Sequence, residues 1–122
     1  ETELVDMNCR VKTEVREKKN DFLEEFKQNK TNYEEAVDFD KISMPLTVRT
    51  RKPGDRFQPL GSRGVKKIKD FFIDNKVSVM ERDTVPIVTM NGVPIWIVGF
   101  RIDDRIRVSE ETTNLLVMKF ET

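Results

Sequence analysis

The sequence predicts an α+β domain in which antiparallel strands form a layered, sandwich-like core and one main basic helix packs on its outside. Three observations support this fold class. Residues 86–100 place two apolar runs on either side of Asn91-Gly92, the pair preferred in a type I′ hairpin turn. Residues 46–51 alternate between apolar and polar side chains, as a half-buried strand does. Residues 65–76 carry an apolar stripe at helical spacing.

The amino-terminal third gives weaker signals. Residues 3–16 predict one strand, although two adjacent apolar residues near its start break the alternation and leave its register open. The apolar side of this strand consists of Leu4, Val5, Met7, Cys9, Val11 and Val15. Residues 17–32 are mostly charged, and they fit either a loop or a short amphipathic helix capped by Asp21.

Two strands are expected next. Residues 33–42 alternate over Val37 and Phe39 and predict an edge strand followed by a turn. In residues 46–51 the alternation directs Leu46, Val48 and Thr50 toward the core. Arg49 and Arg51 should therefore face outward together.

The helix expected over residues 65–76 has an apolar and a basic face. Lys66 and Asp70 are spaced as an i, i+4 pair on the face opposite the stripe. We interpret Phe71 and Phe72 as core residues in preference to base-stacking residues. The stripe consists of Val65, Ile68, Phe71 and Phe72.

The carboxy-terminal half continues the antiparallel pattern. Residues 78–81 match a capping box and predict one helical turn that ends before Pro86. In the hairpin, the apolar second arm should be covered on both faces, and Pro94 requires a bulge or an edge. Strands over residues 105–108 and 113–120 complete a prediction of six to seven strands and one firm helix.

The charge is distributed unevenly although the 22 basic and 22 acidic residues cancel. Residues 49–69 hold eight basic side chains against one acidic side chain, whereas both flanking segments are acidic. The basic run has two interpretations: a solvated face with local ion pairs, or a phosphate-binding surface aided by the start of the helix. Composition alone gives the two interpretations nearly equal weight. The local excess of basic residues favours phosphate binding.

Several functions are excluded or disfavoured by what the chain lacks. The absence of histidine and the single cysteine remove the common nucleophile pairs, a zinc site and an internal disulfide. No nucleotide-binding glycine pattern occurs, so we expect no catalytic residue, no metal site and no cofactor in this chain. No membrane span or signal peptide is evident, which indicates the cytoplasm. A start without methionine suggests a piece of a longer protein.

Residues 46–57, Gly61 and residues 66–73 together resemble the carboxy-terminal domain of bacterial tRNA(Ile)-lysidine synthetase. Residues 38–40, Arg82-Asp83 with Pro86, the hairpin with Trp96, residues 99–102 and Thr112 agree with this resemblance, which covers residues 33–120. Members of this family attach lysine to the wobble cytidine of an isoleucine tRNA with ATP and magnesium. Their chemistry belongs to an amino-terminal ATP-pyrophosphatase domain, and no segment of this chain matches it.

The resemblance implies that the whole chain is one tRNA-recognition domain, similar in fold to a domain of the phenylalanyl-tRNA synthetase β chain. It would recognise the acceptor stem of an isoleucine tRNA and work beside the catalytic domain of the same protein. The implied tRNA contacts are Arg49, Arg51, Lys52, Arg56, Lys66, Lys67 and Lys69, with Arg63, Arg82 and Arg101 as weaker candidates. The residues that shape the loop are Pro53, Gly54, Asp55 and Gly61.

An interaction module is the alternative function. The apolar hairpin over residues 86–100, with Pro94 and Trp96, would then dock against another domain or subunit, and the basic face would only be solvated. A homodimer is compatible with either function. The two functions differ in their response to salt, because phosphate binding weakens steeply with ionic strength and apolar docking does not.

Overall fold

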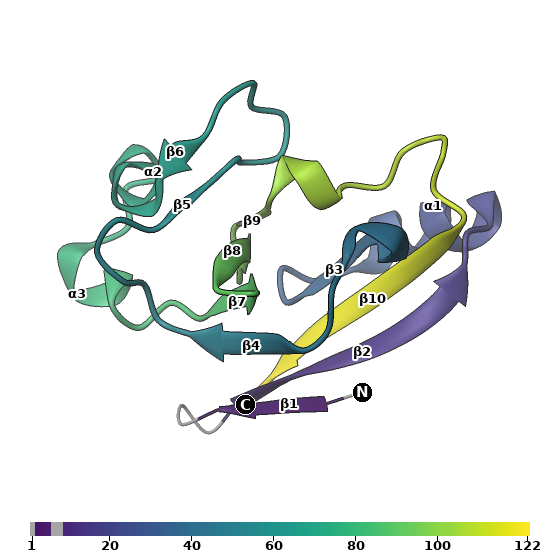
Figure 1. The fold of residues 1–122 in the computed structure, drawn as a ribbon, viewed down its shortest axis with the longest axis horizontal. Helices are drawn as coiled ribbons and strands as arrows, with labels where there is room; N and C mark the ends of the chain where they lie inside the picture. Colours follow the sequence, from purple (N-terminus) through teal and green to yellow (C-terminus); the bar gives the residue numbers. More distant parts are fainter. Residues whose placement is uncertain (1, 6–8) are drawn as a thin grey trace.

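The computed structural model describes residues 2–5 and 9–122, which form two antiparallel four-stranded sheets and a short two-stranded ribbon (Figure 1). The first sheet has the strand order β1-β2-β10-β3. Its strands are β1 (Thr2–Val5), β2 (Cys9–Glu17), β10 (Asn114–Glu121) and β3 (Glu34–Asp38). The expected edge strand near residue 37 is therefore confirmed, since β3 lies at the sheet margin.

The second sheet has the order β4-β7-β8-β9, and the ribbon pairs β5 with β6. The strands of the sheet are β4 (Leu46–Arg49), β7 (Ile87–Met90), β8 (Val93–Ile97) and β9 (Arg101–Ile102). Those of the ribbon are β5 (Arg56–Phe57) and β6 (Lys66–Lys67). All these pairings are antiparallel, as the sequence predicts.

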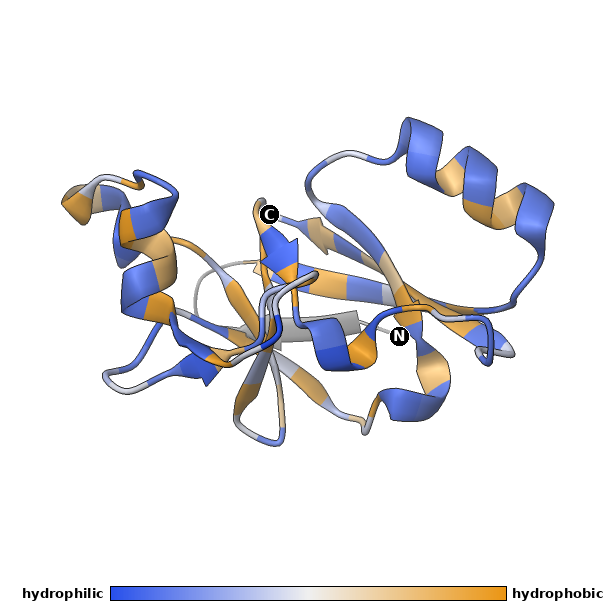
Figure 2. Ribbon diagram, turned by 90° about the horizontal axis from the view of Figure 1, so that it is seen from above, coloured by the Kyte–Doolittle hydropathy of each residue, from blue (hydrophilic) through white to orange (hydrophobic). Residues whose placement is uncertain are grey.

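Three α-helices and two 3₁₀ turns complete the described part of the chain. They are α1 (Asn20–Asn29), α2 (Ile68–Asp74), α3 (Val79–Arg82), η1 (Phe39–Lys41) and η2 (Asp104–Ile106). α1 lies at one end of the molecule and α2 with α3 at the other (Figure 2). None of these helices is long and apolar enough to cross a membrane.

Two apolar clusters form the core. The larger one joins the facing sides of both sheets and includes Val37, Val88, Trp96 and Leu116, all fully buried. The smaller one lies under α2 and attaches it to the second sheet. It contains Phe57, Ile68, Phe71, Phe72, Val77, Val85, Ile87 and Ile97. The interpretation of Phe71 and Phe72 as core residues is thus confirmed, since they expose 3% and 0% of their surface.

The hairpin of β7 and β8 forms as predicted. Asn91 and Gly92 both have positive φ, at 52° and 81°, as a type I′ turn requires. The register shifts where Thr89 pairs with Pro94, which is the bulge expected there. Pro94 and Trp96 are buried, so these two side chains are not available for docking, whereas Val93 and Phe100 of the same segment are 44% and 41% exposed.

The amino-terminal prediction needs two corrections. Residues 3–16 do not form one strand, because β1 and β2 fold back on each other with Val5 opposite Cys9. Met7, assigned to that strand, lies outside the described residues. Residues 20–29 are a helix, but its N-cap is Lys19, and Asp21 lies in the first turn instead of capping it.

The helix expected over residues 65–76 starts three residues late. Lys66 and Lys67 pair with β5 instead, and the Ile68 amide donates to the carbonyl oxygen of Asp55 at 3.0 Å. Val65 is consequently 51% exposed and not part of the apolar stripe. The strand expected over residues 105–108 is also wrong, because the buried Asp103 carboxylate caps η2 there.

The capping box is confirmed in part. The Ser78 hydroxyl accepts from the Glu81 amide, as expected, at 3.3 Å. The Glu81 carboxylate, however, accepts from the Ser78 hydroxyl at 2.8 Å and not from the Ser78 amide. The start of α3 is therefore fixed by these two side chains.

Candidate nucleic-acid interface

The basic loop begins with a tight turn over residues 52–55. The Asp55 amide donates to the Lys52 carbonyl oxygen at 3.1 Å, with Pro53 second and Gly54 third in the turn. Gly54 has a φ of 86°, which a side chain at the third position would oppose, so this is the pattern of a type II turn. Pro53, Gly54 and Asp55 thus occupy the second, third and fourth positions of this turn.

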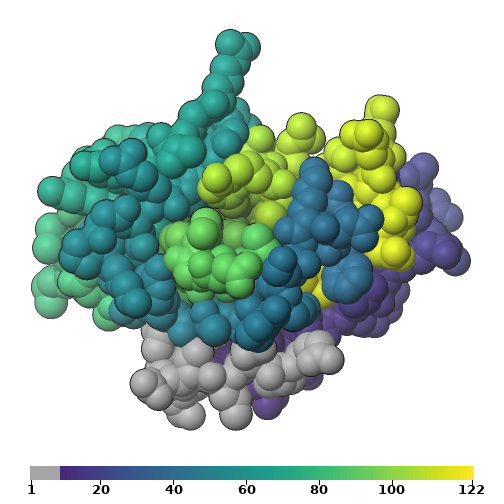
Figure 3. Space-filling view, in the orientation of Figure 1, coloured from purple at the N-terminus to yellow at the C-terminus, as the bar shows by residue number. Residues whose placement is uncertain are grey.

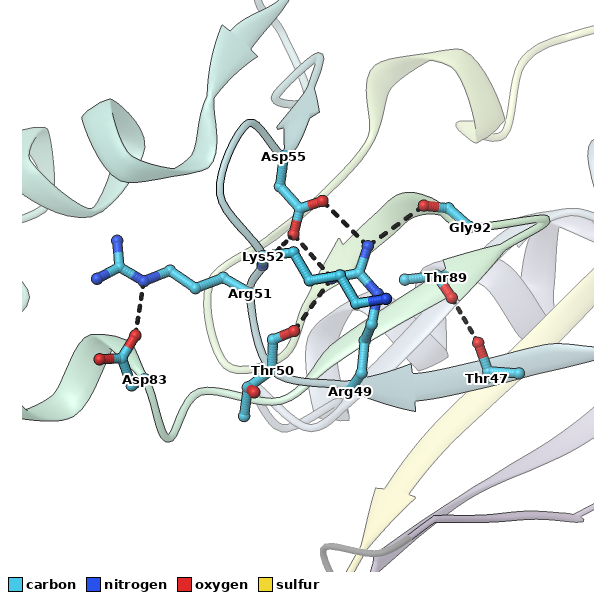
Figure 4. A network of polar contacts seen from close by, with 9 residues as sticks. All are labelled: Thr47, Arg49, Thr50, Arg51, Lys52, Asp55, Asp83, Thr89 and Gly92. Carbon is cyan, nitrogen blue, oxygen red and sulfur yellow. Dashed lines mark hydrogen bonds and ion pairs between the residues drawn. The ribbon is translucent and has the colours of Figure 1, made fainter.

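Arg49 fixes this turn to the second sheet. Its guanidinium binds both carboxylate oxygens of Asp55, at 2.7 and 3.0 Å, and also donates to the carbonyl oxygens of Thr50 and Gly92 (Figure 4). Burial would raise the pKa of Asp55, but hydrogen bonds from Arg49 and the Lys52 amide outweigh it and lower that pKa. Both terminal nitrogens of Arg49 are occupied, so Arg49 is a structural residue here.

Arg51 lies two residues further on and points elsewhere, so the expectation that Arg49 and Arg51 face outward together is wrong (Figure 4). Its Nε donates to Asp83 Oδ1 at 2.9 Å. Its guanidinium carbon lies 5.9 Å from the centroid of the Phe72 ring. Strand β4 ends at Arg49, so the alternation no longer controls Arg51.

A surface hollow of about 450 Å³ gathers much of the predicted site between the turn, β6 and α3. Its basic lining residues are Arg51, Lys52, Lys67, Lys69 and Arg82, and its acidic ones are Asp55 and Asp83. Within residues 2–5 and 9–122, Lys52, Lys67 and Lys69 make no ion pair. Residues far apart in the sequence thus converge on one cationic hollow.

Arg56 and Lys67 lie directly opposite each other in the ribbon. Opposed residues of an antiparallel pair share one face, and like charges there repel. Both side chains are exposed, and neither forms an ion pair with any described residue. A bound anion between them would remove the repulsion.

The remaining predicted residues lie elsewhere. Lys66 points to the other face of the ribbon and forms an ion pair with Asp74, not with Asp70. Lys66 and Arg101 both line a second hollow, of about 510 Å³. The guanidinium carbon of Arg101 lies 5.9 Å from the centroid of the Phe71 ring. Arg63 is exposed on the loop between β5 and β6 and lines neither hollow. In Figure 3 the teal segments, which follow β4 and extend to α2, cover one end of the molecule.

No sequence pattern indicated the residue that anchors this loop. Asp103 is 1% exposed and accepts from the Gln58 amide at 2.9 Å and from Arg105 at 2.7 Å. Burial would raise the pKa of Asp103, but the hydrogen bonds from Arg105 and Gln58 lower it. Next to it, Asp104 accepts from the Gly61 amide, where φ is 85°. This segment holds the loop after β5 in place.

The basic side chains of the first hollow suit the binding of an anion. The described residues contain no group of three or more cysteine, aspartate or glutamate side chains that could hold a metal ion. α2 is short, and its first amide already donates to Asp55, so the expected contribution of the helix start to the site is not seen. Side-chain cations therefore carry the site.

The sequence of this chain matches the family model described as TilS substrate C-terminal domain over residues 46–118. The chain belongs to this family. It is 42% identical over 92 residues to a tRNA(Ile)-lysidine synthase of Caldanaerobacter subterraneus subsp. tengcongensis, and 46% identical over 89 residues to one of Clostridium tetani. These alignments cover 75% and 73% of the chain but only 20% and 19% of the relatives, so the chain matches about a fifth of their length.

Solved structures agree on the fold. A crystal structure of a TILS C-terminal domain is similar over all of the chain and 90% of that protein, with a TM-score of 0.73 and 27% identity. An N-terminal fragment of the phenylalanyl-tRNA synthetase beta-subunit from Pyrococcus horikoshii gives a TM-score of 0.72 at 15% identity, over 91% of this chain and 39% of that one. The expected similarity to a phenylalanyl-tRNA synthetase β-chain domain is thereby confirmed for the fold.

Proposed function

We propose that this TilS C-terminal domain binds the phosphate backbone of an isoleucine tRNA, at the acceptor stem, through the cationic hollow. The observation that carries the proposal is the convergence of Arg51, Lys52, Lys67 and Lys69 from separate elements with their charges largely unpaired. Lys66 and Arg49, by contrast, are each paired with an acidic neighbour. Phosphates would supply the missing anions, with arginine as a bidentate and lysine as a point-charge ligand.

The rest of the parent protein would complete the function. In this proposal the parent ligates lysine to the wobble cytidine of the tRNA, and its ATP and magnesium bind outside this chain. The domain acts in the cytoplasm beside the catalytic domain, and a homodimer is compatible with it. Contacts to phosphates would position an A-form helix by its shape and carry little sequence information.

The test is a fluorescence-anisotropy titration of this chain with a labelled acceptor-stem RNA hairpin at several salt concentrations. With about four to six phosphate contacts, affinity should fall roughly 100- to 1000-fold between about 50 and 200 mM salt. A Lys67→Ala/Lys69→Ala variant should bind more weakly, and the slope of log affinity against log salt should decrease by about two.

The matched control is Lys19→Ala/Lys27→Ala. It removes the same charge from the N-cap and the last turn of α1, at the opposite end of the molecule (Figure 2). Its affinity and salt slope should stay close to those of the unmodified chain. No binding at low salt, or equal losses in both variants, would contradict the proposed interface.

A further inference from the structure

We infer that Asp83 is a positioning residue that orients Arg51 as a bidentate ligand for an RNA phosphate. This inference rests on the proposed function, because it assigns roles within the same hollow. Asp83 was not among the site residues that the sequence suggested. It is separated from Arg51 by 32 residues, and only the fold brings them together.

The first argument is the donor count of Arg51. A guanidinium has five N–H donors, and Arg51 uses only its Nε, on Asp83. The four N–H groups of its two Nη atoms have no hydrogen-bond partner among the described residues, and both Nη atoms point away from Asp83 (Figure 4). This leaves the end of the guanidinium, the edge that binds a phosphate through two parallel hydrogen bonds, available.

The second argument is that Arg51 is held on two sides. Asp83 binds its Nε, and the buried ring of Phe72 lies near its guanidinium. Only 23% of the Arg51 side chain is exposed, so its orientation is restricted before any ligand arrives. A pre-oriented fork loses less conformational entropy on binding than a free one.

The third argument is that Asp83 is itself fixed. It follows α3, whose start is capped by Ser78, and the adjacent Arg82 donates from its Nε to the Val77 carbonyl oxygen at 3.0 Å. Its side chain is nevertheless 74% exposed, so the ion pair contributes little to stability. A carboxylate in a phosphate-binding hollow repels the ligand, and we propose that the orientation of Arg51 outweighs this repulsion.

The test compares Asp83→Ala with Asp83→Asn in the RNA titration at low salt. Both variants remove the same negative charge, but asparagine keeps an oxygen that can accept from Arg51 Nε. We expect about a tenfold loss of affinity for alanine and about a threefold loss for asparagine, since a neutral hydrogen bond keeps about half of the free energy of a charge-assisted one. Introducing Asp83→Ala into an Arg51→Ala background should cause no further loss.

If Asp83 acted only by its charge, both variants would bind RNA more tightly, and to the same extent, in either background. That result would overturn the inference while leaving the proposed function intact. Failure of the unmodified chain to bind RNA would instead contradict the proposed function. Urea unfolding of each variant should give a midpoint close to that of the unmodified chain, because Asp83 is exposed.

Discussion

The basic loop has an inner side, where Arg49 and Asp55 bind each other, and an outer rim, where lysine side chains line the cationic hollow. The two regions use the same kinds of residue for different purposes. On the inner side, Arg49 and Asp55 satisfy each other and the surrounding backbone. On the rim, Lys52, Lys67 and Lys69 have no ion-pair partner within the described part of the chain. Charge alone therefore does not identify a residue that binds a phosphate. The number of hydrogen-bond donors that the residue leaves unused does.

Arg49 and Arg51 differ in the number of donors that they use, although their side chains are almost equally exposed. Their side chains are 20% and 23% exposed, so burial does not separate them. Arg49 donates from both Nη atoms to protein acceptors, whereas Arg51 donates only from Nε. We expect changes on the inner side to reduce stability and changes on the rim to reduce RNA affinity.

The largest effect on stability is expected at Asp103, which anchors the loop after β5. Asp103→Ala would leave the Gln58 amide without its acceptor and would remove the ion pair with Arg105. We expect a loss of about 2–4 kcal/mol in the free energy of unfolding, measured by urea denaturation. Asp40→Ala, at an exposed aspartate, should change it by less than about 0.5 kcal/mol. Equal losses would show that Asp103 does not anchor the loop.

Arg49→Lys should have the next largest effect. Lysine keeps the charge but cannot bind both oxygens of Asp55 and the carbonyl groups of Thr50 and Gly92 at once. We expect a loss of about 1–2 kcal/mol in the free energy of unfolding. Arg51→Lys should leave stability within about 0.5 kcal/mol and weaken RNA binding about tenfold. The reverse pattern would refute the assigned roles of the two arginines.

Lowering the pH should reproduce part of the loss of stability that is expected from changes at Asp55 and Asp103. Because the pKa values of Asp55 and Asp103 are lowered in the folded chain, each contributes stability that is present above the usual aspartate pKa of about 3.9 and lost as pH falls through the lowered value. Asp55→Asn should therefore have a smaller drop in urea midpoint than the unmodified chain between neutral and strongly acidic pH. An identical pH profile for both would show that Asp55 does not contribute in this way.

Local sequence patterns predict some of these features and not others. The turn, the hairpin and the buried stripe of α2 follow from local rules about proline, glycine and apolar spacing. The start of α2 does not, because pairing of Lys67 with Arg56 overrides the helical pattern. Asp103 and Asp83 were also beyond local rules, since Gln58 and Arg51 are their partners only in the folded chain.

The smallest effect is expected at Lys67, and it should have the opposite sign for stability. Replacing Lys67 by threonine removes the repulsion with Arg56 across the ribbon, and threonine suits a strand. We expect a gain of about 0.2–0.5 kcal/mol in the free energy of unfolding at low salt, shrinking as salt screens the two charges. The same variant should lose RNA affinity. A substitution that stabilises the fold and weakens binding would identify the Arg56–Lys67 pair as a feature maintained for its ligand and not for the fold.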